Sequence, residues 1–167
     1  MLFRSNGDIY FTDQGQTGLH DPTGKVYRYT RGGRLECLLD TGPSPNGLVL
    51  DPNEAVLFVA MTRDNAVWRL PFMKDRSVSK VGRFCSLFGP SGPDGMTMDR
   101  AGRLFVAHAS LGHVFVFAPN GESIARIKSC AGQSCTNVAI GGAKADRLYI
   151  TESVTGTVLV ADISGLK

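Results

Sequence analysis

Two short motifs in the sequence place an oxygen-bearing side chain between a proline and a glycine. Asn46 stands in Pro45-Asn46-Gly47, and Asp94 stands in Pro93-Asp94-Gly95. Proline and glycine favour tight turns, which would present the side chain between them at a bend of the chain. Amide and carboxylate oxygens suit hard cations such as Ca²⁺ and Mg²⁺, whereas zinc prefers nitrogen and sulfur ligands. The motifs therefore predict either a divalent-cation site or two structural turns that begin strands.

An internal repeat in the sequence indicates where Asn46 and Asp94 lie relative to each other. An apolar run around an aromatic residue occurs four times, and the aromatic residues are 48, 47 and 44 positions apart. Another apolar strand precedes each run, one follows it, and a weaker fourth strand follows the pair, near 35–39, 78–84 and 123–128 in the first three repeats. The four central runs are Ile9-Tyr10-Phe11, Leu57-Phe58-Val59, Leu104-Phe105-Val106 and Leu148-Tyr149-Ile150.

Four short strands in every 44 to 48 residues are typical of the blades of a β-propeller. Stacked helical repeats of similar length would need apolar residues at a spacing of about 3.6, which these runs lack. We therefore predict an all-β chain that forms a single partial β-propeller domain, with about four consecutive four-stranded blades in an incomplete ring. The predicted blades cover residues 1–44, 45–91, 92–134 and 135–167.

The residue just before each innermost strand of a propeller lies at the mouth of the central channel. The repeat puts Asn46, Asp94 and Asn137 at this position. We expect Asn46 and Asp94 to lie side by side at one end of the channel, because they begin the innermost strands of adjacent blades. Asn137 is a weaker candidate for the same site.

Further polar residues end the second strand of their repeats, near the channel face. Asp13 and His108 are candidates for substrate binding, and the alternatives are a turn role for Asp13 and a hydrogen-bonded structural role for His108. His108 would also suit proton transfer beside Asp94, since histidine has an unperturbed pKa near 6.5. Glu152 ends the corresponding strand of the last repeat, and we interpret it as a solvated strand end, with a carboxylate directed to the channel as the alternative.

The composition of the chain argues against nucleic acid and membrane as binding partners. The net charge of +3 is spread along the chain without a block of like charges, which argues against nucleic acid. No apolar run approaches the roughly 20 residues that span a bilayer, and the first residues do not resemble a signal peptide, so we expect a cytoplasmic protein without membrane contact. The four cysteines lack zinc-binding spacing and are interpreted as buried thiols, with a Cys130–Cys135 disulfide as the alternative.

Four longer motifs recur in order along the chain: Tyr10-Phe11-Thr12-Asp13, Pro45-Asn46-Gly47-Leu48, Gly92-Pro93-Asp94-Gly95-Met96 and Thr136-Asn137-Val138-Ala139-Ile140-Gly141-Gly142. Through these motifs the chain resembles, from Gly7 to Thr151, the C-terminal portion of the gluconolactonase/senescence-marker-protein/luciferin-regenerating-enzyme family. This resemblance implies a six-bladed propeller with one divalent cation in its channel, Ca²⁺ first, with Mg²⁺, Mn²⁺ or Zn²⁺ as alternatives. It also implies that Asn46 and Asp94 are metal ligands and that Asp94 is the catalytic general base.

The activity that the resemblance implies is metal-dependent hydrolysis of a sugar-acid lactone, a small-molecule substrate. A third ligand, a Glu, and a substrate-contacting Asn belong in the family to segments that would precede Met1, so we expect a truncated member with impaired activity. The alternative is a non-catalytic propeller module or an inactive fragment. A propeller of the strictosidine-synthase type is disfavoured by the two Pro-x-Gly motifs. Blades left open at the ends would expose apolar faces, so we also expect self-association.

Overall fold

The computed structural model describes residues 1–166, and these form short strands with one turn of 3₁₀ helix. No helix within this range is long and apolar enough to cross a membrane. The elements in chain order are β1 (Leu2–Phe3), β2 (Ile9–Asp13), β3 (Gly24–Tyr29), β4 (Leu35–Gly42), β5 (Pro45–Leu50), β6 (Val56–Met61), η1 (Thr62–Asp64), β7 (Ala66–Pro71), β8 (Gly82–Ser86), β9 (Pro93–Met98), β10 (Leu104–His108), β11 (His113–Phe117), β12 (Ser123–Lys128), β13 (Cys135–Gly141), β14 (Arg147–Glu152) and β15 (Thr157–Asp162).

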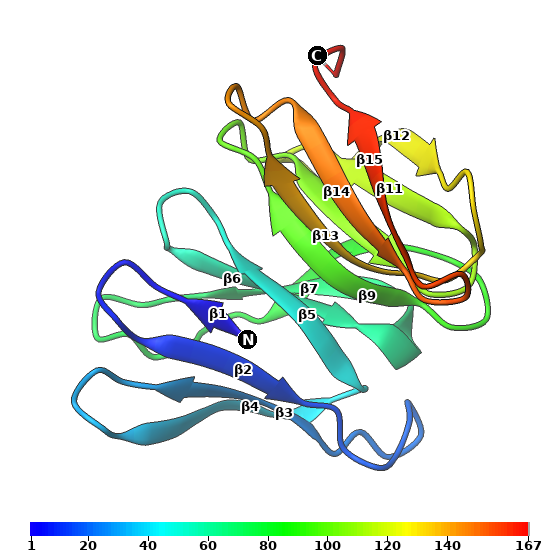
Figure 1. Cartoon of the computed structure of the whole chain (residues 1–167). Coiled ribbons are helices and arrows are strands. Elements are labelled where there is room, and N and C mark those ends of the chain that lie inside the picture. Colours follow the sequence, from blue (N-terminus) through cyan, green and yellow to red (C-terminus); the bar gives the residue numbers. More distant parts are fainter. Residues whose placement is uncertain (167) are drawn as a thin grey trace.

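These strands form four antiparallel meanders. The first three sheets are β1–β4, β5–β8 and β9–β12, and the last is the three-stranded sheet β13–β15. The sheets fan out around the adjacent inner strands β5, β9 and β13 and do not close a ring (Figure 1). This confirms the predicted all-β, open propeller. One predicted strand differs, since β8 begins at Gly82 and Val78 makes only an isolated bridge to Phe72.

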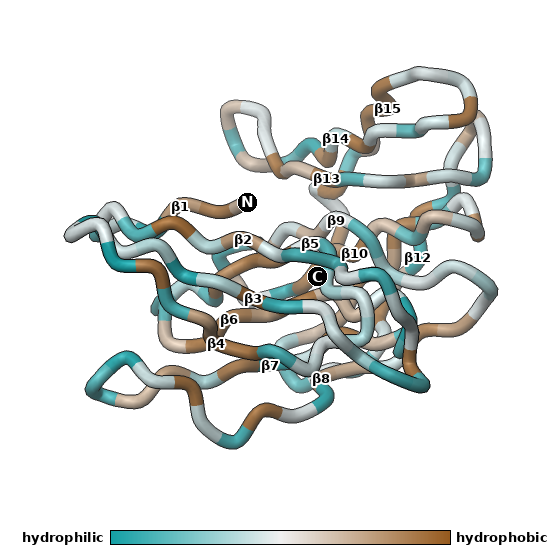
Figure 2. The backbone as a smooth tube through the Cα atoms, turned by 90° about the horizontal axis from the view of Figure 1, so that it is seen from below, coloured by the Kyte–Doolittle hydropathy of each residue, from teal (hydrophilic) through white to brown (hydrophobic). Residues whose placement is uncertain are grey.

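The core consists of three apolar layers, one between each pair of consecutive sheets. Alternate residues of each central strand point to opposite faces, as the period of a strand requires. Hereafter, the forward face of a sheet is the one toward the next sheet in sequence, and the back face is the opposite one. Tyr10, Phe58 and Phe105 occupy the same position on the forward faces of the first three sheets, and all three are buried. Hydrophobic segments accordingly recur along the strands of every sheet (Figure 2).

The cysteines differ in part from the expectation of buried thiols. All four are free, so the Cys130–Cys135 alternative is not formed. Cys85 and Cys135 are buried, whereas Cys37 and Cys130 are exposed. The exposed pair lies on β4 and in the loop before β13, where side chains face solvent because no further element covers them.

Candidate metal centre

The inner strands β5 and β9 present their polar residues through matching irregularities. Each strand carries a β-bulge, in which two residues lie opposite a single alanine of the next strand. The two residues are Asn46 and Gly47 in β5, and Asp94 and Gly95 in β9. A bulge leaves one residue out of the regular ladder and re-aims its side chain. The same local device therefore directs Asn46 and Asp94 out of their sheets at the same end of the fold.

The glycine of each bulge allows adjacent inner strands to approach closely. A Cβ atom on Gly47 would lie 2.3 Å from the carbonyl oxygen of Asp94. A Cβ atom on Gly95 would lie 2.1 Å from Oδ1 of Asn137 in the following sheet. Neither distance is compatible with a side chain, so glycine is required at both positions for this packing. The close approach places Asn46 next to Asp94 across the boundary between the second and third sheets.

Threonine hydroxyls from the preceding blade hold the backbone of these segments. Thr12 Oγ1 donates to the carbonyl oxygen of Asn46 at 2.8 Å, and Thr62 Oγ1 donates to the carbonyl oxygen of Pro93 at 2.8 Å. Each bond crosses from one blade to the next and satisfies a carbonyl group at or beside a bulge. The position of each polar residue is therefore fixed by a neighbouring blade as well as by its own strand.

The electrostatic surroundings of Asp94 favour a cation. Both Asn46 and Asp94 are half-buried. Burial raises the pKa of the Asp94 carboxyl to about 6, although a hydrogen bond with the Asn46 side chain acts to lower it. Among residues 1–166, no lysine, arginine or histidine forms an ion pair with Asp94. A desolvated carboxylate without a cationic partner is stabilised by a bound cation, because the cation supplies the missing opposite charge.

The donor chemistry of this pair fits a hard divalent cation in part. One carboxylate and one amide are oxygen ligands of the kind that Ca²⁺ and Mg²⁺ prefer. The described part of the chain contains no group of three or more His, Cys, Asp or Glu side chains that could hold a metal ion. Asn46 and Asp94 would thus supply two of the six to eight oxygen ligands that Ca²⁺ takes.

The third inner strand, β13, does not carry Asn137 at the position of Asn46 and Asp94, where the spacing of the repeat had placed it. In β13 the strand register places Thr136, rather than Asn137, at the position of Asn46 and Asp94. Asn137 takes the place of the two glycines, and its Oδ1 accepts the N–H of Val138 at 2.9 Å. The β13–β14 hairpin is longer than its counterparts, since Ile140 pairs with Leu148, whereas Leu50 pairs with Leu57 and Met98 with Leu104. This difference shifts the count from the aromatic residue.

The two proposed substrate-binding residues, which end the second strands of the first and third sheets, have different environments. Asp13 is exposed, and its carboxylate accepts the N–H of Gly15 at 3.0 Å. His108 is completely buried, with its Nδ1 3.4 Å from the nitrogen of Ser110 and its Nε2 without a hydrogen-bond partner. Burial lowers the pKa of the His108 imidazole, which favours its neutral form. His108 pairs with Pro93 in the ladder, so it lies one strand outward from Asp94.

Glu152, at the corresponding position of the last sheet, is not the solvated strand end that we expected. Its side chain is buried, and its carboxylate accepts the hydroxyl and N–H of Thr155 and the N–H groups of Ser134 and Val154. These hydrogen bonds, led by that from the Thr155 hydroxyl, lower the pKa of Glu152 to about 2. The glutamate therefore organises the loops around it. In the sequence, the Ser and Thr residues near Glu152 are the signal from which this role could have been predicted.

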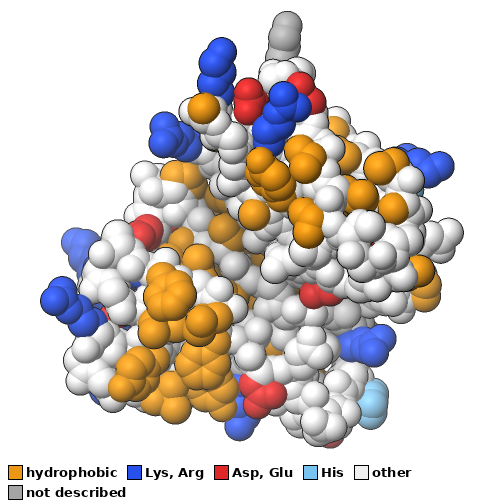
Figure 3. Space-filling model, viewed as in Figure 1, with side chains coloured by type: hydrophobic (Ala, Val, Ile, Leu, Met, Phe, Trp, Pro, Cys, Tyr) orange, Lys and Arg blue, Asp and Glu red, His pale blue; other side chains and the backbone are white. Residues whose placement is uncertain are grey.

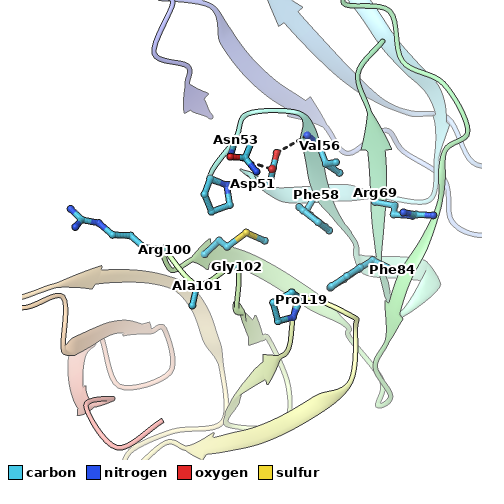
Figure 4. A pocket seen from close by; sticks show the side chains of 12 residues that line it. Asp51, Asn53, Val56, Phe58, Arg69, Phe84, Arg100, Ala101, Gly102 and Pro119 are labelled. Carbon is cyan, nitrogen blue, oxygen red and sulfur yellow. Dashed lines mark hydrogen bonds between the residues drawn. The ribbon is translucent and has the colours of Figure 1, made fainter. Parts of the chain in front are cut away.

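A hollow of about 460 Å³ opens at the other end of β5 and β9 (Figure 4). Val56, Phe58, Phe84 and Met98 form its apolar lining between the second and third sheets. The carboxylate of Asp51 at its rim accepts N–H groups of its own turn, including that of Val56 at 2.6 Å. This hollow shares no residue with the bulges that carry Asn46 and Asp94.

Comparison with protein families gives one match over most of the chain. The family model described as SMP-30/gluconolactonase/LRE-like region matches residues 1–154. Among curated proteins, a gluconolactonase of Zymomonas mobilis is 33% identical over 92% of this chain and 47% of its own length. A pentonolactonase of Haloferax volcanii is 31% identical over 78% of this chain and 50% of its own length. The chain thus spans about half the length of the curated relatives it matches.

Solved structures share the fold at lower sequence identity. A calcium-binding regucalcin of Agrobacterium tumefaciens superposes with a TM-score of 0.80 at 21% identity, covering 95% of this chain and 58% of that one. A luciferin-regenerating enzyme superposes with a TM-score of 0.78 at 20% identity, covering 90% of this chain and 52% of that one. These similarities show that the four sheets are arranged as in larger β-propellers.

Proposed function

The chain belongs to the SMP-30/gluconolactonase/LRE-like family, and we propose that it provides part of the metal- and substrate-binding end of a lactone hydrolase. The proposed substrate is a sugar-acid lactone, a class suggested by the names of the gluconolactonase and pentonolactonase relatives. The proposed cofactor is one divalent cation, with Ca²⁺ as the first candidate because a structural neighbour is a calcium-binding protein. We propose that activity of the 167-residue chain is impaired relative to its longer relatives.

One observation carries the proposal. Asn46 and Asp94 come from different sheets, yet matching bulges and the close approach at Gly47 place them together. Two unrelated structural turns would not require adjacent strands to meet at the same level. Family membership supports the kind of function, and this convergence supports the choice of Asn46 and Asp94 as its residues.

The proposed chemistry assigns separate tasks to the residues. A bound divalent cation would act as a Lewis acid toward the lactone carbonyl. The carboxylate of Asp94 would accept the proton of the attacking water. The side-chain amide of Asn46 would fix the orientation of that carboxylate through their hydrogen bond.

Asp13 and His108 are the proposed substrate-binding residues. Asp13 is exposed at the end of β2 and is free to contact a polar ligand with its second oxygen. His108 has an unpartnered Nε2 but no exposed surface, so a direct contact would require the neighbouring loop to move. A role that needs no such movement is to support the strand that carries Asp94.

Calorimetric titration of the 167-residue chain with CaCl₂ tests the metal assignment without relying on activity. We expect saturable binding at one site, weakened at least tenfold by Asp94→Asn and also weakened by Asn46→Ala, where tenfold corresponds to about 1.4 kcal/mol. Asp40→Asn is the matched control, because Asp40 is an exposed aspartate on β4, outside the bulges. Hydrolysis of gluconolactone, followed by acid release in excess Ca²⁺, should be lost in Asp94→Asn.

Two outcomes would count against the proposal. Absence of saturable Ca²⁺ binding by the parent chain, with Mg²⁺ and Mn²⁺ giving the same result, would favour a non-catalytic module. Equal binding by the parent and Asp94→Asn would place the cation elsewhere in the fold.

A further inference from the structure

The turn η1 lies between the two segments that carry the proposed metal ligands. The N–H groups of Thr62 and Arg63 donate to the carbonyl oxygens of residues 44 and 43, at 3.0 and 3.2 Å, shortly before Asn46 in the chain. On the other side, the Thr62 hydroxyl donates to the carbonyl oxygen of Pro93, directly before the proposed carboxylate ligand. The turn therefore contacts both halves of the proposed metal centre through its backbone and one hydroxyl.

Further contacts fix the end of this turn. The side-chain amide of Asn65 donates to the carbonyl oxygen of Gly89 at 2.6 Å, and its own carbonyl oxygen accepts the N–H of Leu87 at 2.7 Å. A Cβ atom on Gly92 would lie 2.1 Å from the carbonyl oxygen of Thr62, so the two backbones are in close contact. The sheets on both sides of the turn are described, and the position of the turn between them is well defined.

The two charged residues of the turn have different environments. The carboxylate of Asp64 is nearly buried and accepts hydrogen bonds from Trp68 Nε1 at 2.7 Å and from Arg83 at 2.6 Å. These partners lie on β7 and β8, the outer strands of the sheet, so Asp64 is engaged away from the inner strands. Arg63 is exposed and forms no ion pair within residues 1–166. Its positive charge is therefore available to an anion.

Arg63 also stands apart in the distribution of charge over the fold. The connections at its end of the four sheets contain no other Lys or Arg; they are residues 14–23, 43–44, 62–65, 87–92, 109–112, 129–134 and 153–156. The turns at the opposite end contain several, including Arg31, Lys74 and Lys144. On the face shown in Figure 3, Lys and Arg side chains gather mainly at the left and upper margins, over turns of that opposite end. Arg63 is thus not part of a general basic surface.

We propose that Arg63 binds an anionic group of the substrate, which would then be a lactone that carries a carboxylate or a phosphate besides its ring. This inference rests on the proposed lactone hydrolysis and narrows its substrate class. A guanidinium group suits both anions, because its N–H donors match a pair of oxyanion oxygens. Arg63 is joined to the proposed metal centre through its neighbour Thr62 and lies beside the two ligands. It therefore determines specificity for a group remote from the reacting carbonyl and takes no part in proton transfer.

Metal binding alone does not account for a positive side chain at this place. A guanidinium group near a cation site weakens cation binding, because like charges repel each other. An anionic group of the substrate offsets this repulsion by bringing a negative charge to the same end of the fold. The cation held by Asn46 and Asp94 and the anion held by Arg63 would accordingly favour each other's binding.

Ligand-detected NMR titration of the 167-residue chain at a fixed concentration of free Ca²⁺ tests the proposal with gluconate, glucarate and 6-phosphogluconate. All three have the carboxylate that ring opening releases, and the last two carry a second carboxylate or a phosphate at the other end. We expect the parent to bind one or both of these about three- to tenfold more tightly than gluconate, and the stronger one identifies the group. Arg63→Gln should bind all three alike, and Arg63→Lys should retain part of the preference. Arg126→Gln is the control, because Arg126 is an exposed arginine on the outer strand β12.

Equal affinity of the parent for the three acids, including undetectable binding of all of them, would overturn the role of Arg63. So would a preference that persists in Arg63→Gln, or a lower urea midpoint in both Arg63 variants without a change in preference, which indicates a structural role. Titration of the same proteins with CaCl₂ separates this inference from the proposed function. Ca²⁺ binding that depends on Asp94, without any preference among the acids, removes the role of Arg63 alone. A preference that depends on Arg63, in a chain that does not bind Ca²⁺, retains the anion site and removes the metal-dependent hydrolase.

Discussion

Replacement of Gly47 by alanine adds one carbon atom at the closest contact between the second and third sheets. The new Cβ would lie 2.3 Å from the carbonyl oxygen of Asp94 and 2.8 Å from the Cα atom of Gly95. Both are backbone atoms of an inner strand, so relief requires β5 and β9 to move apart. Overpacking of this kind costs about 1–3 kcal/mol. A loss of about 2 kcal/mol would shift the folding equilibrium roughly 30-fold.

Two measurements on Gly47→Ala separate general destabilisation from an effect on the site. Urea denaturation, followed by the fluorescence of the single tryptophan Trp68, should show a lower midpoint with an unchanged slope. Calcium titration below the transition should show weaker binding, because separation of the strands moves Asn46 away from Asp94. Gly82→Ala is the control, since the nearest atom to its added Cβ is 4.0 Å away, and we expect a change within about 0.5 kcal/mol.

Unchanged stability and Ca²⁺ binding in Gly47→Ala would refute the close contact at Gly47. If Gly47→Ala unfolds at the same urea concentration as the parent and binds Ca²⁺ equally well, the inner strands are not in this close contact. The convergence of Asn46 and Asp94 would then lose its structural basis. Lower stability with unchanged Ca²⁺ affinity would retain the packing and remove the metal assignment.

Two further predictions follow from side-chain environments. Glu152 has a pKa of about 2 in the folded state against 4.5 as its ordinary value, so its contribution to stability is present above pH 4.5 and is lost as the pH falls toward 2. Glu152→Gln should therefore lower the urea midpoint at pH 7, and this difference from the parent should vanish near pH 2. Burial raises the pKa of the Cys85 thiol to about 12, so iodoacetamide should modify exposed Cys37 and Cys130 in the native protein, with Cys85 and Cys135 reacting after unfolding. Peptide mass spectrometry gives the order in which the cysteines react, and early labelling of Cys85 would contradict its buried position.

The repeat could be predicted from the sequence because it depends on local periodicity. Tyr10, Phe58, Phe105 and Tyr149 mark the central strands, and the alternation around them places one residue on each face in turn. The number of sheets follows from the number of repeats, since each repeat forms one sheet. Family resemblance was needed to choose between a cation site and two turns, because spacing alone allowed both.

What the sequence did not reveal depends on contacts between blades. Counting from the aromatic residue suggested Asn137 for the third inner strand, whereas the bulge and a longer hairpin place Thr136 there. The burial of Glu152 likewise depends on the loop before β13, from which Ser134 donates across 18 positions of sequence. Neither the position of Thr136 nor the burial of Glu152 recurs at a fixed spacing, so the pattern of apolar residues does not reveal them.

The same dependence on neighbouring blades links stability to the proposed metal centre. Asn46 is held by a hydroxyl of the first sheet, and Asp94 lies against the backbone of the second. A cation held by both residues would therefore cross-link the second and third sheets at their inner edge. Binding to the folded state alone stabilises it by about 2.7 kcal/mol when the free ligand is at 100 times the dissociation constant. The proposed metal centre and the packing of the blades would thus strengthen each other, because each depends on β5 and β9 remaining in contact.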